Sequence, residues 1–165
     1  MAGKRIKLPG DYEPKIKSAE EYNKVVSGSH LVGIQLVKSS FDVEADLYED
    51  GNRKLNFDRE FQGYAFDKEE RSVAGWFKFE VTVKKGRKSV LKGSAIYMVI
   101  YGLEFDADED AAITFCERIG VFAAFPYFRA HVAHLAWEAN APLPPLPTIA
   151  TRGAPVRAVQ PPGKD

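Results

Sequence analysis

Alternating hydrophobic and polar residues dominate the middle of the chain, and this period-two pattern predicts β-strands. In the first run, residues 31–48, apolar positions alternate through Ile34 and Leu36 and then resume at Phe41 and Val43. These two series have opposite parity. A change of parity within one strand indicates a β-bulge or a change of face, so we expect one long first strand with such an irregularity between the two series.

Three further runs predict the rest of a sheet. Residues 55–66 give a weaker strand after the Asp50-Gly51 turn, and two strong strands within residues 76–105 join at Gly86. In the first strong strand, Phe77, Phe79, Val81 and Val83 share one face, and Trp76, Lys78, Glu80 and Thr82 share the other. Because short connections join antiparallel neighbours, the pattern predicts a four-stranded antiparallel sheet.

A short helix is expected before the sheet, over residues 18–27. Ser18 suits the N-cap position, Glu21 completes a capping box, and Gly28 marks the end of the helix. We expect residues 1–17 to form a flexible arm ahead of this helix.

After the sheet the pattern predicts a long, broken helix. Its first piece ends at Gly120. Its second piece, residues 126–139, starts with Pro126, whose missing N–H suits a first helical turn. Residues 141–150, APLPPLPTIA, contain too much proline for a helix or a central strand, so they should lie extended over another surface. The tail, residues 151–165, is expected to be disordered.

These elements fit a single α+β domain over residues 18–150 of the 165-residue chain. Lys+Arg and Asp+Glu both number 23, and this balance argues against a general attraction to nucleic acid or anionic lipid. Cys116 is the only cysteine, so a reducing compartment is expected. The first residues lack a signal-peptide pattern, and uninterrupted apolar runs reach about half of the ~18 residues a membrane span needs. We therefore expect a soluble, cytoplasmic protein without membrane insertion.

Three polar residues of the second helical piece are the strongest candidates for chemistry. His131, His134 and Glu138 are spaced i, i+3 and i+7, which places them on one side of a helix and within reach of one metal ion. An enzymatic or small-molecule-binding α+β domain that uses these residues is therefore one hypothesis. No fourth ligand is evident, and a solvated helix face explains the same residues.

Acidic residues near the start of the first helical piece match part of a calcium loop. Asp106, Asp108, Asp110 and Glu117 fit its ligand positions, but Ala111 stands where the sharp turn needs glycine. Acidic residues that cap a helix N-terminus explain this cluster better. The sequence contains no nucleophile elbow, phosphate loop or paired-cysteine motif. We therefore expect no enzyme, no cofactor and no metal.

The chain contains more apolar residues than one helix and one face of a sheet can bury against each other. A stripe packed on the sheet accounts for Phe122, Phe125, Phe128, Val132 and Leu135. Tyr127 and Trp137 fall outside this stripe, and in the last strand Tyr97 and Tyr101 share one face while Met98 lies on the other. A sheet that is apolar on both faces needs two covers, and a domain of this size supplies one helical layer. The second cover is expected to be another copy, a client chain or an obligate partner.

The stretch FPYFR (125–129), followed by a helix and then by PLPPLPTI, resembles the family of the protein-export chaperone SecB. The match covers about residues 120–149, and residues 31–119 agree with that family in the order of elements. This resemblance implies a SecB-like fold assembled as a homo-oligomer, a dimer of dimers. It also implies an ATP-independent holdase whose long apolar grooves bind unfolded or nascent polypeptide clients.

The resemblance further implies which side chains meet a client. The residues expected in the apolar groove and lid are Trp76, Tyr97, Tyr101, Phe122, Phe125, Tyr127, Phe128, Trp137, Leu143, Leu146 and Ile149. Such grooves accept many sequences, because apolar burial is non-directional and contributes ~25 cal/mol per Å². Pro126 and Arg129 complete the family motif, and Arg129 is expected to make an ion pair or a helix-end contact.

Two departures from the family leave the partner open. Export chaperones of this family present an acidic sheet surface to the translocase motor SecA and usually carry an acidic tail. Here Lys78 and Lys84 accompany Glu80 on the corresponding face, and the tail is basic. The candidate partners are therefore SecA or a cognate antitoxin, as in the dedicated chaperones of toxin–antitoxin–chaperone systems.

Overall fold

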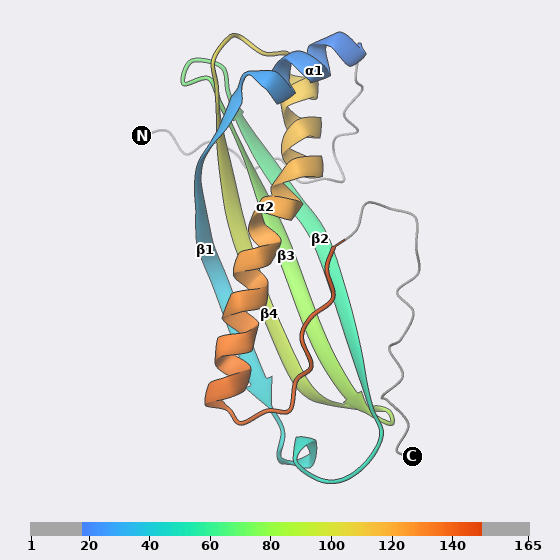
Figure 1. Cartoon of the computed structure of the whole chain (residues 1–165). Coiled ribbons are helices and arrows are strands. Elements are labelled where there is room, and N and C mark those ends of the chain that lie inside the picture. The colour runs from blue at the N-terminus through green and yellow to red at the C-terminus, as the bar shows by residue number, and fades with distance from the viewer. Residues whose placement is uncertain (1–17, 150–165) are drawn as a thin grey trace.

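The computed structural model of the chain describes residues 18–149. The arm and the tail predicted from the sequence, residues 1–17 and 151–165, lie outside these described residues. The elements are α1 (Ala19–Ser27), β1 (Ser29–Val43), the 3-10 turn η2 (Ala45–Leu47), β2 (Arg53–Asp67), β3 (Ser72–Lys85), β4 (Lys88–Leu103) and α2 (Glu109–Glu138). The four strands form one antiparallel sheet in the order β1-β4-β3-β2, as predicted. Helix α2 crosses one face of the sheet, and α1 packs beside its N-terminal end (Figure 1).

Strand β1 carries the predicted bulge and a second one. Its register against β4 shifts between Leu36 and Lys38, where the parity of the sequence pattern changes, and again at Val32. The two residues left out of the pairing, Val32 and Val37, are 60% and 51% exposed. Because β1 is an edge strand, its outer side and these valines are open to solvent.

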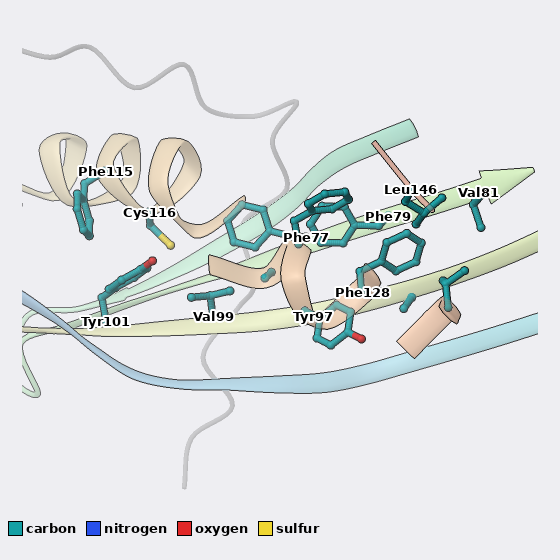
Figure 2. Close-up of a cluster of buried hydrophobic side chains, with 14 of the residues drawn as sticks. Phe77, Phe79, Val81, Tyr97, Val99, Tyr101, Phe115, Cys116, Phe128 and Leu146 are labelled. Atoms are coloured by element: carbon teal, nitrogen blue, oxygen red, sulfur yellow. The ribbon is translucent and has the colours of Figure 1, made fainter. Parts of the chain in front are cut away.

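The core lies between α2 and one face of the sheet. Along most of β3 and β4, alternate residues point to this inner face and are buried, as the alternation of the sequence predicts. The inner face contributes Phe77, Phe79, Val81, Tyr97, Val99 and Tyr101, and α2 contributes Phe115, Cys116 and Phe128 (Figure 2). Phe125 of α2 belongs to the same cluster. Ring centroids lie 5.3 Å apart for Phe79 and Phe128 and 5.0 Å apart for Tyr101 and Phe115, which is the spacing of well-packed aromatic pairs.

Helix α2 is continuous over 30 residues and is not broken at Gly120 or Pro126. Gly120 lies inside the helix because α2 approaches the sheet closely there: a Cβ atom at this position would lie 2.5 Å from the Phe77 ring. Pro126 also lies inside the helix, where its missing N–H leaves the Phe122 carbonyl without its i+4 donor. The two residues that suggest a break in the sequence are therefore accommodated within one helix.

Both helices begin as their sequences indicate. The Glu21 N–H donates to Ser18 Oγ at 3.1 Å, and the Ala111 N–H donates to Asp108 Oδ1 at 3.2 Å. Arg71 Nε donates to Asp106 Oδ1 at 3.0 Å. Two of the acidic residues that resemble a calcium loop are thus a helix cap and an ion-pair partner.

Among residues 18–149, α2 is the one helix whose length and apolar composition would suit a membrane span, with a mean hydropathy of 1.2 over its most apolar segment. That segment is 56% buried inside the fold. The position of α2 on the sheet accounts for its apolar character.

Candidate functional site

Helix α2 and the segment that follows it enclose a hollow of about 570 Å³, which we call the lid groove. Pro126, Ala133 and Trp137 line it from α2, and Leu143 and Leu146 line it from residues 141–149, which we call the lid. The lid runs extended between α2 and β2, as its proline content predicts (Figure 1).

The sequence around the end of α2 fixes where the lid starts. Asn140 takes a positive φ of 49°, a left-handed conformation that asparagine tolerates better than most residues and that turns the chain back. The Ala141 N–H donates to the Ala136 carbonyl at 2.8 Å, and the Tyr48 hydroxyl donates to the Ala139 carbonyl. At the other end Leu146 is buried in the core. The lid is therefore anchored at its base and again at Leu146.

A second hollow of about 700 Å³ lies beside the N-terminal half of α2, and we call it the phenylalanine groove. Its apolar lining comes from four elements: Tyr22 of α1, Phe61 of β2, Phe77 and Phe79 of β3, and Ile119, Val121 and Phe122 of α2. The centres of the Phe61 and Phe77 rings, which both line it, lie 5.1 Å apart. Phe122 is 37% exposed at its mouth, so the groove offers aromatic surface to solvent.

Charged side chains surround the phenylalanine groove. They are Arg59, Glu60, Lys78, Glu117 and Arg118. Lys78 Nζ lies 3.6 Å from Glu80 Oε2, and the Arg118 guanidinium lies 5.6 Å from the centre of the Tyr22 ring. Glu60 and Glu117 form no ion pair with any residue between 18 and 149.

The residues predicted to meet a client fall into three groups. Tyr97, Tyr101, Phe125, Phe128 and Leu146 are buried in the core, and Leu146 also borders the lid groove. Phe122, Trp137 and Leu143 line the grooves, as does Pro126 of the motif. Tyr127 is 54% exposed on α2, Trp76 lies partly exposed on the opposite sheet face, and Ile149 packs against the edge of the core.

The sequence pattern did not identify Tyr22, Phe61, Phe77 or Val121 as groove residues. Phe61 and Phe77 alternate with polar neighbours, which indicates burial in general, and Tyr22 stands three positions before the buried Val25 on α1. These patterns predict that the side chains point toward the core. They cannot show that α2 leaves part of this inward surface uncovered.

Arg129 makes a different contact from the one expected. Its guanidinium carbon lies 5.9 Å from the centre of the Phe125 ring, one helical turn earlier, and it forms no ion pair with any described residue. A cation over an aromatic face is attracted by the ring quadrupole. Arg129 therefore covers the Phe125 ring while lining the lid groove.

Two of the three candidate metal ligands pair with each other, and the third has a partner on β1. His131 Nε2 lies 2.7 Å from Ser39 Oγ on β1, and His134 Nε2 lies 3.4 Å from Glu138 Oε1. The described part of the chain contains no cluster of three or more His, Cys, Asp or Glu side chains able to hold a metal ion. The hypothesis of a site at His131, His134 and Glu138 therefore has no geometric support.

Burial between α2 and the sheet also raises the pKa of two side chains, one on α2 and one on β4. It raises the pKa of Cys116 to about 12, with a smaller contribution from the charge of Glu117. It raises the pKa of Tyr101 to about 12, with a smaller contribution from Cys116. Both groups stay protonated at neutral pH, and a buried neutral thiol is chemically inert.

No protein-family model and no curated protein matches the sequence. Among solved structures, the fold is similar to that of the Mycobacterium tuberculosis Rv1957 SecB-like chaperone in complex with a ChAD peptide from the Rv1956 HigA1 antitoxin. The TM-score is 0.65 at 15% sequence identity, and the similarity covers 80% of this chain and 97% of the other. The SecB-like fold implied by the FPYFR motif and by the order of elements is thereby confirmed.

Proposed function

We propose that this protein is a molecular chaperone, a holdase that binds unfolded or nascent polypeptide in the lid groove and the phenylalanine groove. The observation that carries the proposal is the pair of hollows, about 570 and 700 Å³, lined by apolar side chains from α2, β2, β3 and the lid. The SecB-like fold supports it.

The lining suits clients of varied sequence. Aromatic and aliphatic surfaces contribute apolar burial of ~25 cal/mol per Å², which does not depend on the direction of approach. The proline-rich lid is already extended and anchored, so little conformational entropy is lost when a client packs against it. Neither effect needs a nucleotide, a metal or a chemical step, so we propose a non-enzymatic, ATP-independent and cofactor-free protein.

For the client we propose a cognate antitoxin. The Rv1957 chaperone was solved with a peptide from an antitoxin, and that peptide is a polypeptide client of the proposed kind. The outer sheet face argues against the alternative, delivery of exported proteins to SecA. There Glu80 lies within 3.6 Å of Lys78 Nζ and 3.5 Å of Lys92 Nζ, so this part of the face is not acidic overall.

We further propose that the protein assembles in the cytoplasm as a dimer of dimers. The open edge of β1 exposes Val32 and Val37, and Tyr127 is exposed on α2. A dimer of dimers has two different interfaces, one within each dimer and one between the dimers. Exposed apolar residues on two different elements could supply one interface each.

The test is suppression of aggregation. The protein is mixed without ATP with a slowly refolding client, and light scattering is followed with the wild type, with Phe122→Ala/Trp137→Ala and with Val26→Ala. Val26 is an exposed apolar residue of α1 that lines neither groove, so it is the matched control. Loss of two aromatic contacts should weaken client binding at least tenfold, or about 1.4 kcal/mol.

The wild type and Val26→Ala are expected to suppress aggregation at stoichiometric amounts, and the double variant to fail. Trp137 is 79% exposed, so its removal should leave the fold intact, which a thermal melt checks. A wild type that neither binds the client nor slows aggregation would overturn the proposal.

A further inference from the structure

The lid groove contains one cation and no carboxylate. Among residues 18–149, Arg129 is the one charged side chain that lines it. Small side chains line the groove from α2, and prolines and leucines line it from the lid, which runs beside the helix (Figure 1). The small side chains are Ala130, Ala133 and Ala136. A chain that fills this groove therefore meets apolar surface everywhere except at Arg129.

Arg129 has no counter-charge within the described part of the chain. Its guanidinium forms no ion pair with a residue between 18 and 149, and its contact is with the Phe125 ring, 5.9 Å from the ring centre. Glu138, on the same half of α2, has its own partner, because its Oε1 lies 3.4 Å from His134 Nε2. The positive charge of Arg129 is thus available to a ligand in the groove.

Trp137 lines the same groove further along α2 and is 79% exposed. At ~1.5 Å per residue, the helix rises roughly 12 Å from Arg129 to Trp137. An extended polypeptide advances ~3.3 Å per residue, so about four residues cover this distance. Side chains an even number of positions apart in an extended chain point to the same side. One side chain of a client can therefore contact Trp137 while another reaches Arg129.

We infer that the lid groove selects client segments that carry an apolar side chain and a carboxylate about four positions apart, and that Arg129 binds the carboxylate. The inference rests on the proposed function and names the class of client. A guanidinium donates two parallel hydrogen bonds to a carboxylate, a geometry that other side chains do not reproduce. An exposed pair of this kind changes affinity by up to about fivefold. The acid therefore adds a preference to apolar binding and does not replace it.

The selection is tested with fluorescein-labelled peptides of Ala, Val and Ser that carry one Trp and one Glu four positions apart. In matched peptides Gln replaces Glu, or the spacing is three, which turns the two side chains to opposite sides of an extended chain. Each peptide is made with Trp before Glu and with Glu before Trp, and fluorescence anisotropy measures its affinity for the full-length protein. In one of the two orders, the Glu peptide with spacing four should bind about fivefold more tightly than its matched peptides. Equal affinities in both orders would overturn the inference.

Variants assign the preference to Arg129. Arg129→Gln should bind the Glu and Gln peptides equally, whereas Arg129→Lys, which keeps the charge, should retain part of the preference. If Arg129 only covers the Phe125 ring, Arg129→Gln would weaken both peptides alike and leave the ratio of their affinities unchanged. Arg59→Gln removes a cation from the phenylalanine groove and is the matched control, which should keep the wild-type ratio. An unchanged ratio in Arg129→Gln, or a ratio lost in Arg59→Gln, would overturn the assignment.

The same protein is used in the aggregation assay, so that the inference and the proposed function fail differently. A wild type that suppresses aggregation but binds the Glu and Gln peptides equally would refute the selection and leave the holdase function intact. A wild type that neither suppresses aggregation nor binds any peptide would refute both.

Discussion

Cys116 lies where α2 packs closely against β3. A Cβ atom added at Gly75 on β3 would lie 2.8 Å from its Sγ, so glycine is needed opposite the thiol. The same enclosure keeps solvent away and raises the pKa of Cys116 to about 12 from an ordinary 9.0. Because the thiol is buried, the free energy of unfolding should depend on pH in the alkaline range.

We expect the free energy of unfolding to fall as the pH rises between about 9 and 12. In this range the unfolded chain loses the thiol proton while the folded chain retains it, so the unfolded state binds fewer protons. The stabilising effect of the neutral thiol is complete below pH 9 and declines by about 1.4 kcal/mol per pH unit above it.

Urea titrations of the wild type and of Cys116→Ala at several pH values check this expectation. The wild type should lose stability with pH more steeply than the variant, because the variant lacks the thiol but keeps Tyr101. Parallel curves for the two proteins would contradict the buried-thiol explanation.

At the scale of single residues, alternation in the sequence predicts which face a side chain takes but not how far it is covered. Phe128 and Trp137 were both expected to meet a client, yet the first is fully buried and the second is 79% exposed. They lie nine positions apart on one helix, and their exposure depends on where β2, β3 and the lid pack. Those segments are distant in the sequence, so a local pattern does not contain this information.

At the scale of elements, α2 runs through a proline in its interior. Replacing Pro126 with Ala restores an N–H to the Phe122 carbonyl and removes a residue that costs about 3 kcal/mol in a helix interior. We expect Pro126→Ala to raise the free energy of unfolding by about 1–3 kcal/mol in urea titrations. His134→Ala, on the exposed side of the same helix, should change it by less than about 0.5 kcal/mol. A Pro126→Ala protein less stable than the wild type would show that the proline is needed where it is.

The strands, the first helix and the extended lid could all be predicted from local patterns. The parity change near Val37 predicted the bulge, and Ser18 predicted the helix start. Gly120 and Pro126 indicated a break because both residues disfavour helix on their own. The structure retains the helix because Gly120 admits the Phe77 ring and because packing on the sheet outweighs one lost hydrogen bond. The two grooves could not be predicted, since they depend on the spacing of elements brought together only by the fold.

At the scale of the whole molecule, β1 is an edge strand, and we propose it as a contact between copies. Its outer side offers unpaired backbone groups over 15 residues, with Val32 and Val37 exposed at the bulges. We expect the wild type to sediment at a multiple of 18.4 kDa, and Val32→Lys/Val37→Lys to shift toward 18.4 kDa, because lysines on an edge oppose strand pairing.

Sedimentation equilibrium measures the shift. Val26→Lys, which places the same charge on α1, is the control and should keep the mass of the wild type. A wild type that is monomeric, or a double variant with an unchanged mass, would exclude β1 as the contact between copies.

The hydroxyl of Tyr48 reaches from the turn between β1 and β2 to the Ala139 carbonyl at the end of α2. A connection at the tip of the sheet thereby sets the base of the lid, although 91 positions separate the two residues. An insertion or deletion in that turn would shift the position of the lid. The lid groove would then become wider or narrower without any change in the residues that line it. A change in the length of this turn would therefore alter the size of the side chains that fit into the proposed client-binding groove.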